Sequence, residues 1–441
     1  MNFIRSFSLM FGTKVISLIL LLLSRVILAR LLGPAGLGSF GSALNLTTII
    51  SRWGSAGIGP ATQFMSGKYP DSKNTILTYA TLFSLILGLV NIALVYAFGQ
   101  KIAAWQFTEN PSAEQIFNQL FPFLPIIILS MTLPVFLLGT GRYQFYSQTQ
   151  IIPLLIQTII LSSAFWRKAT METVVIAQVF YWLSTVIIGF IYIGFQNFDI
   201  RLDRALFHTY IKLALSMWPL VIFQFGLARL PVLIGSQYLG SKDLGYYLLA
   251  LNIAESFFLV HTSITPIVFN HTINKQSDPA FLAKSIRFSN LLLLSAFTIT
   301  CLIGKPIFTT LFGEDFNLSW ALLLRLFPWV LVHGMVSILL NYLIAAGERC
   351  FVFCTQSLAF VILIILGTVL SPHYRAAGLC LAGFSSSLTA FILAFLIIRF
   401  SMNKELRLMA LFLPIRQDWK DLYSMLSGIK KKKGQWIKIR F

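Results

Sequence analysis

The stretch LGPAGLGSFGSALNLTT at residues 32–48 recurs 207 positions later as LGSKDLGYYLLALNIAE at residues 239–255, without a gap. Seven of the seventeen positions are identical, and they include two glycines and one asparagine within apolar sequence. This agreement indicates an internal repeat. The chain is therefore predicted to consist of two six-helix lobes, residues 1–200 and 201–400, and a basic cytoplasmic tail at 401–441.

The composition around this repeat is that of an integral membrane protein. Of the 441 residues, 57% are hydrophobic and only 11% are charged, against roughly 25% charged residues in soluble domains. A membrane-spanning helix needs about 20 apolar residues. The chain contains twelve segments that meet this need: 11–32, 37–64, 76–98, 117–138, 148–166, 173–195, 213–235, 244–269, 289–312, 321–346, 351–370 and 376–400. We predict an all-α membrane protein of about 12 helices in two pseudo-symmetric lobes around a central cavity.

The distribution of basic residues predicts the orientation in the membrane, because cytoplasmic connections collect Lys and Arg. Twenty-three of the 34 basic residues fall on the side that holds the N-terminus, six fall on the opposite side, and five lie within spans. Both termini are therefore predicted to be cytoplasmic. The net charge of +19 follows this topology, so no nucleic-acid partner is expected. The basic tail either rests on anionic membrane lipids or remains solvated.

Six spans separate the two copies of the repeat, so both copies enter the membrane with the same orientation. The halves should then be related by an axis along the bilayer normal, with the central path between them. Gly33 and Gly240 lie in the short turns that follow helices one and seven. Glycine there is predicted to permit the backbone conformation of a tight turn.

Arginines inside the spans are the candidate substrate-binding residues. A charge at the bilayer centre costs about 2.5–3.5 kcal/mol, so it needs a wet cavity, a partner or a route to the surface. Arg25 and Arg229 lie at comparable depths before the two turns, and we expect them to face each other and to contact an anionic substrate. Arg52 is assigned the same role. Arg30 and Arg325 lie nearer the outer interface, where snorkelling is the simpler interpretation, and are secondary candidates.

Glu255 is the most deeply placed acid of the sequence, ~17 Å into its predicted span. Asn252 shares its helix face, and Asn45 is the counterpart of Asn252 in the first repeat; both asparagines are candidate substrate ligands. Glu255 is expected either to pair with Arg229 or to accept a coupling proton or cation, and an ion pair that only locks helices together is the alternative.

Neither metal nor cofactor chemistry is indicated by the remaining reactive side chains. The four cysteines have neither disulfide spacing nor a completed zinc set. His261 and His333 are predicted to be isolated on apolar helix faces, which is typical of packing residues rather than of catalytic ones.

Several motifs, in their order and spacing, resemble a known family. They are ARLLGPAGLGSF from Ala29, GIGPATQFMS from Gly57, LFGEDF from Leu311, LLNYLIAAGER ending at Arg349, and YRAAGLCLAG from Tyr374. Together they resemble the polysaccharide-biosynthesis flippases for O-antigen or exopolysaccharide repeat units, a branch of the multidrug/oligosaccharidyl-lipid/polysaccharide (MOP) exporters. The resemblance covers nearly the whole chain and implies a MATE-like fold of two lobes.

The resemblance also implies a function. Such a protein flips a polyprenyl-pyrophosphate-linked oligosaccharide across the inner membrane by alternating access, without catalysis, and a glycan polymerase receives the product. It implies that cavity arginines engage the pyrophosphate. Three alternatives remain open: an ion-coupled drug or metabolite antiporter of the same superfold, a membrane glycan polymerase or ligase, and a structural scaffold. The cationic character of the spans disfavours cationic drugs as substrates.

Overall fold

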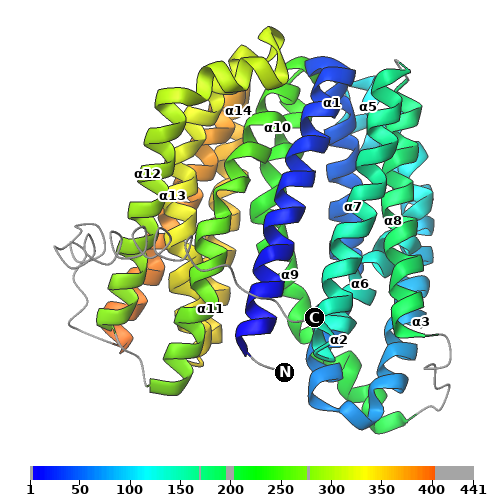
Figure 1. Ribbon diagram of the computed structural model, residues 1–441, viewed down its shortest axis with the longest axis vertical. Helices are drawn as coiled ribbons and strands as arrows, with labels where there is room; N and C mark the ends of the chain where they lie inside the picture. Colours follow the sequence, from blue (N-terminus) through cyan, green and yellow to red (C-terminus); the bar gives the residue numbers. More distant parts are fainter. Residues whose placement is uncertain (1–2, 168–169, 195–202, 276–278, 403–441) are drawn as a thin grey trace, which may run out of the picture. The chain divides into compact units, whose positions relative to one another are not determined.

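The computed structural model describes residues 3–167, 170–194, 203–275 and 279–402 and is helical throughout (Figure 1). The first part of the chain forms α1 (Phe3–Gly54), α2 (Ile58–Lys68), α3 (Lys73–Leu94), α4 (Gln100–Gln106), α5 (Pro111–Leu120), α6 (Leu124–Gly139), α7 (Tyr143–Trp166) and α8 (Met171–Ile193). The remainder forms α9 (Arg204–Tyr238), α10 (Ser241–Ser256), α11 (Phe258–Lys275), α12 (Pro279–Phe312), α13 (Asn317–Ala345) and α14 (Arg349–Ile397).

The number of membrane spans agrees with the prediction of about twelve. Within the described residues, ten helical stretches are long and apolar enough to cross a membrane. Two of them are much longer than the rest: a 43-residue stretch within α1 and a 52-residue stretch that contains α14, and each has room for two crossings. Each is interrupted by one residue outside helical geometry, Gly33 in α1 and Arg375 in α14. Dividing both there gives twelve possible crossings, as many as predicted, so the chain is a multi-pass membrane protein. The predicted span 37–64 is the exception in its bounds, because the chain leaves helical geometry between α1 and α2.

Exposed apolar faces show which surfaces meet lipid. On α3, Leu82, Leu85, Ile86 and Leu89 recur at helical spacing and are 38–61% exposed. An apolar stripe of this kind would be unfavourable in water, but it packs favourably against the hydrocarbon chains of lipid. The buried face of the same helix packs through Ile76, Tyr79 and Ala80.

The helices form two compact units. The first comprises Met1–Ser256, Pro306–Leu326 and Phe360–Gly383, and the second comprises Phe257–Lys305, Phe327–Ala359 and Phe384–Phe441. These boundaries differ from the predicted lobes, which therefore stay a prediction. The predicted tail, 401–441, lies outside the described residues apart from its first two positions.

The two copies of the sequence repeat touch each other within the first unit, where α1 packs beside α10 (Figure 1). A Cβ atom added to Gly38 would lie 1.8 Å from the Ser241 carbonyl oxygen, and one added to Gly245 would lie 1.8 Å from the Pro34 carbonyl oxygen. The repeat register pairs Gly38 with Gly245 and Pro34 with Ser241. The contact is thus reciprocal, with equivalent atoms of the two copies exchanging places, and it depends on the absence of side chains at both glycines.

The turn glycines behave differently in the two copies. Gly33 has φ 64° and ψ −178°, a conformation that is essentially restricted to glycine. Gly240 does not have a positive φ. The prediction of a glycine-dependent turn is therefore right for Gly33 and wrong for Gly240, because α9 and α10 are joined by ordinary backbone geometry.

This difference leads to a prediction for stability. Gly33→Ala should lower the free energy of unfolding by about 1–3 kcal/mol, because alanine is strained at this φ and ψ. Gly240→Ala is the matched control, since a Cβ there meets no heavy atom within 4 Å. Thermal unfolding of the detergent-solubilised full chain should show a lower midpoint for Gly33→Ala alone. Equal midpoints for the two variants would contradict this interpretation of the turn.

Candidate functional site

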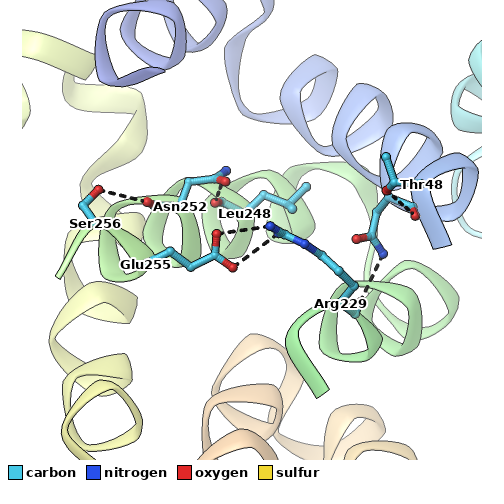
Figure 2. A network of polar contacts seen from close by, with 7 residues as sticks. Thr48, Arg229, Leu248, Asn252, Glu255 and Ser256 are labelled. Carbon is cyan, nitrogen blue, oxygen red and sulfur yellow. Dashed lines mark hydrogen bonds and ion pairs between the residues drawn. The ribbon is translucent and has the colours of Figure 1, made fainter. Parts of the chain in front are cut away.

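An ion pair between α9 and α10 forms the centre of the candidate site. Arg229 and Glu255 meet through two contacts, Nη1 to Oε1 at 3.3 Å and Nη2 to Oε2 at 3.3 Å. Figure 2 shows the guanidinium reaching from its helix to the carboxylate. This fork-like arrangement is the geometry in which arginine recognises planar anions. The side chains keep 31% and 23% of their surface exposed, so the pair is accessible to a competing anion.

The position of Glu255 on α10 explains why it needs a cationic partner. It is the penultimate residue of α10, where the carbonyl ends of the helix create a negative potential. A carboxylate at this end of a helix is unfavourable by itself, and its free-energy cost is larger inside a membrane span. Arg229 compensates for both effects.

The backbone beside Arg229 is fixed by the first copy of the repeat. Asn45, only 6% exposed, donates a hydrogen bond from Nδ2 to the Arg229 carbonyl oxygen at 3.1 Å. Thr48, one turn further along α1, donates to the carbonyl oxygens of Leu44 and Asn45 (Figure 2). The α1 helix thereby holds the stretch of α9 that carries the arginine.

The repeat-related asparagine has a different contact. Asn252 donates from Nδ2 to the Leu248 carbonyl oxygen at 2.7 Å, within its own helix. Its carbonyl oxygen accepts a hydrogen bond from Ser256 at 3.3 Å (Figure 2). The structure therefore brings Asn45 to Arg229, while Asn252 stays on α10, one turn before Glu255.

Arg25 is the third charged residue of this site. It is half-buried on the first arm of α1 and lies within electrostatic range of both Arg229 and Glu255. Its neighbour Ser24 is hydrogen-bonded to Thr158 of α7 at 2.7 Å, which fixes this part of the arm. Two guanidinium groups thus lie within electrostatic range of one carboxylate. This excess of positive charge, held inside membrane spans, suits an anionic group. We call Arg25, Arg229 and Glu255 the Arg229 site.

Arg52 lies apart from these charges, among aromatic side chains. Its Cζ atom is 5.7 Å from the ring centroid of Phe225, and it lies within electrostatic range of Tyr181 on α8. Sequence reasoning missed Phe225 and Tyr181 as neighbours. No sequence signal separates them from the other aromatic residues, which make up 14% of the chain.

The sequence matches a family model described as polysaccharide biosynthesis protein over residues 27–321. The chain belongs to this family. A comparison with curated proteins finds no match.

Solved structures show where this family member stands by fold. It is similar to a lipid II flippase MurJ in an inward closed conformation, with a TM-score of 0.75 and 14% identity over 99% of this chain and 94% of that one. It is also similar to an inward-facing multidrug resistance MATE transporter of the MOP superfamily, with a TM-score of 0.68 and 13% identity over 86% and 94% of the two chains. A third similar structure is a MOP superfamily transporter from Pyrococcus furiosus, with a TM-score of 0.62 and 14% identity over 90% of this chain and 95% of that one. The fold is therefore the one that these flippase and transporter structures share, as the motifs suggested.

The two secondary arginines of this family member lie elsewhere. Arg30 donates from Nε to the Leu311 carbonyl oxygen at 2.9 Å and from Nη2 to that of Thr310. These are among the last carbonyl groups of α12, where a cation interacts favourably with the helix dipole. Arg325 is exposed on α13. The structure brings neither of them to the Arg229 site.

The two histidines of this family member, expected to be isolated, share aromatic neighbours in the second unit. His261 is 2% exposed and is hydrogen-bonded through Nδ1 to Ser289 Oγ at 2.8 Å. Phe258 contacts both rings, at centroid distances of 6.1 Å to His261 and 5.0 Å to His333. The expectation of isolation is wrong, because folding brings His333 of α13 against Phe258, which lies one turn from His261 on α11. Among the described residues, no three His, Cys, Asp or Glu side chains gather into a metal-binding group.

Proposed function

We propose that this family member is a flippase that moves a polyprenyl-pyrophosphate-linked oligosaccharide from the cytoplasmic to the outer leaflet of the inner membrane. The observation that carries the proposal is the Arg229 site, where Arg25 and Arg229 outnumber the single carboxylate of Glu255. A pyrophosphate offers oxygen acceptors to both guanidiniums. The family and the fold of a lipid II flippase support a lipid-linked substrate.

The charge balance favours this substrate over the alternatives. A site for cationic drugs would need an excess of carboxylates. Here Glu255 is already engaged by Arg229, so a cation would meet a site that is positive overall. An arriving pyrophosphate competes with Glu255 for Arg229 and gains Arg25 as a second partner.

In the mechanism we propose, the headgroup passes between two rocking lobes while the lipid tail stays in the bilayer. With both termini cytoplasmic, outward movement of the anionic headgroup follows the membrane potential, which contributes ~2.3 kcal/mol per charge per 100 mV. Glu255, released from Arg229 during transport, is the candidate for a coupling proton or cation. A glycan polymerase would take up the product at the outer leaflet.

Transport in proteoliposomes tests the proposal. The full chain is reconstituted with a fluorescent undecaprenyl-pyrophosphate-linked glycan, and the probe reaching the opposite leaflet is measured over time. Arg25→Gln and Arg229→Gln should each slow transport about tenfold or more, because each removes a charge-assisted contact worth ~1.5–3 kcal/mol.

Arg204→Gln, an exposed arginine at the start of α9, is the matched control and should transport at the wild-type rate. Complementation of a strain that lacks its own glycan translocase, at matched expression, should rank the variants in the same order. Wild-type rates for both Arg25→Gln and Arg229→Gln would refute the assignment of the site.

A further inference from the structure

Arg52 belongs to a second positive centre in the membrane spans of the first unit. Arg52 on α1, Tyr181 on α8 and Phe225 on α9 come together there, and we call these three residues the Arg52 cluster. Trp53, the next residue of α1, contacts Phe360 at a centroid distance of 6.5 Å, and its carbonyl oxygen accepts a hydrogen bond from Trp218 Nε1 at 2.6 Å. The surroundings of Arg52 are therefore aromatic.

No acidic side chain among the described residues neutralises the charge of Arg52. Within the described part of the chain, no acidic side chain lies within ion-pair distance of Arg52. Its Nε atom is buried and has no hydrogen-bond partner there. This contrasts with Arg229, whose charge is matched by Glu255. A guanidinium inside a membrane span needs a wet cavity, a partner or a route to the surface, and a bound anion would supply the partner that Arg52 lacks.

The Arg52 cluster continues the Arg229 site along two helices. On α1, Asn45 and Arg52 are seven residues apart and share a face, which places them ~10 Å apart along the axis. On α9, Phe225 and Arg229 are four residues apart and share a face, at a spacing of ~6 Å. Asn45 contacts Arg229, and Arg52 contacts Phe225. A ligand anchored at the Arg229 site can therefore extend along the same surface to Arg52.

This separation assigns the two centres to different parts of one ligand. Along these helices, ~6–10 Å of axial rise separate the residues of the Arg52 cluster from Arg229 and Asn45. The part of the ligand assigned to Arg52 is therefore the one that follows the pyrophosphate, which in a lipid-linked glycan is sugar. Aromatic faces, which are electron-rich, attract the C–H faces of sugar rings. A guanidinium beside them selects a planar carboxylate.

We infer that the Arg52 cluster is a specificity subsite for a carboxylate-bearing sugar, so that the transported glycan is acidic near its lipid-linked end. This inference rests on the proposed function and adds the class of sugar to it. Arg52 supplies the charge-assisted contact to the carboxylate. Phe225 and Tyr181 position the ring.

The test compares two probes that differ only in the carboxylate. One is undecaprenyl pyrophosphate linked to a disaccharide of glucose and glucuronic acid, and the other carries glucose in place of glucuronic acid. Binding to the full chain in nanodiscs is measured by thermophoresis. The wild type should bind the acidic probe about tenfold more tightly, a difference equivalent to ~1.4 kcal/mol.

The variants separate the inference from the proposed function. Arg52→Gln should lower the affinity for the acidic probe to that for the neutral one, and its binding of the neutral probe shows that it is folded. Arg25→Gln should lower the affinity for both probes by a similar factor. Equal wild-type affinities, or an equal loss for both probes in Arg52→Gln, would overturn the inference alone. Failure of the wild type to bind either probe more tightly than undecaprenol would overturn the proposed function and the inference with it.

Discussion

Gly38→Ala is expected to destabilise the protein strongly. The new methyl group would lie 1.8 Å from the carbonyl oxygen of Ser241 and 2.9 Å from the backbone nitrogen of Gly245. Backbone atoms cannot rotate away as a flexible side chain can, so α1 and α10 would have to separate. Overpacking of a well-packed core costs about 1–3 kcal/mol, and a clash with backbone belongs at or above the top of that range.

The prediction is measured by thermal unfolding and by the amount of folded protein recovered from membranes. Gly245→Ala should behave like Gly38→Ala, because its methyl group would lie 1.8 Å from the Pro34 carbonyl oxygen. The Gly38→Ala, Gly245→Ala double variant should lose less stability than the sum of the two single losses, since both methyl groups push apart the same pair of helices, α1 and α10.

Gly59→Ala on α2 is the matched control, because no heavy atom lies within 4 Å of its added Cβ. If Gly38→Ala unfolded at the same temperature as Gly59→Ala, the conclusion that the two repeats pack closely at Gly38 would be wrong.

The second large effect concerns Glu255. Glu255→Gln keeps the size of the side chain and removes its charge, leaving Arg229 without its anion. We expect a loss of stability of about 1–3 kcal/mol, since both partners are partly exposed and water offsets some of the deficit. Affinity for a pyrophosphate lipid should rise, because the competing carboxylate is gone. Transport should slow, because release now lacks the carboxylate that reclaims Arg229.

Arg229→Gln provides the opposite case, with weaker binding and slower transport. The double variant should regain much of the lost stability, because neither charge is left unpaired, but it should not regain binding. Stability from thermal unfolding, affinity from thermophoresis and rate from proteoliposomes give the three measurements. If Glu255→Gln weakened binding as much as Arg229→Gln, then Glu255 would serve to position Arg229, and the competition that we describe would be wrong.

The fold was largely predictable because hydropathy is a local property. Twelve apolar segments could be counted along the chain, and the two longest helices divide at Gly33 and Arg375, where the segments had been separated. The first break could be expected from the sequence, because it falls on Gly33 and a φ of 64° is a conformation that glycine adopts readily. The second break, at Arg375 with φ 51°, could not be expected in this way.

The site was predictable only in part, because contacts between helices depend on how each helix is rotated. The repeat register suggested that Arg25 and Arg229 lie at similar depth, and the structure brings both near Glu255. Nothing in the sequence indicated that Arg30 would bind the carbonyl end of α12, almost 300 residues away. The aromatic neighbours of Arg52 were equally hidden, because three different helices supply Arg52, Tyr181 and Phe225.

The reciprocal contact at Gly38 and Gly245 also bears on how such a chain could arise. A surface that meets its own duplicate through equivalent atoms is self-complementary. Two separate half-length polypeptides could form the same contact as a homodimer. Fusion of their genes would then require no new interface. In such a fused chain each copy could diverge from the other, and Glu255, which stands at the register position of Thr48, is one such difference.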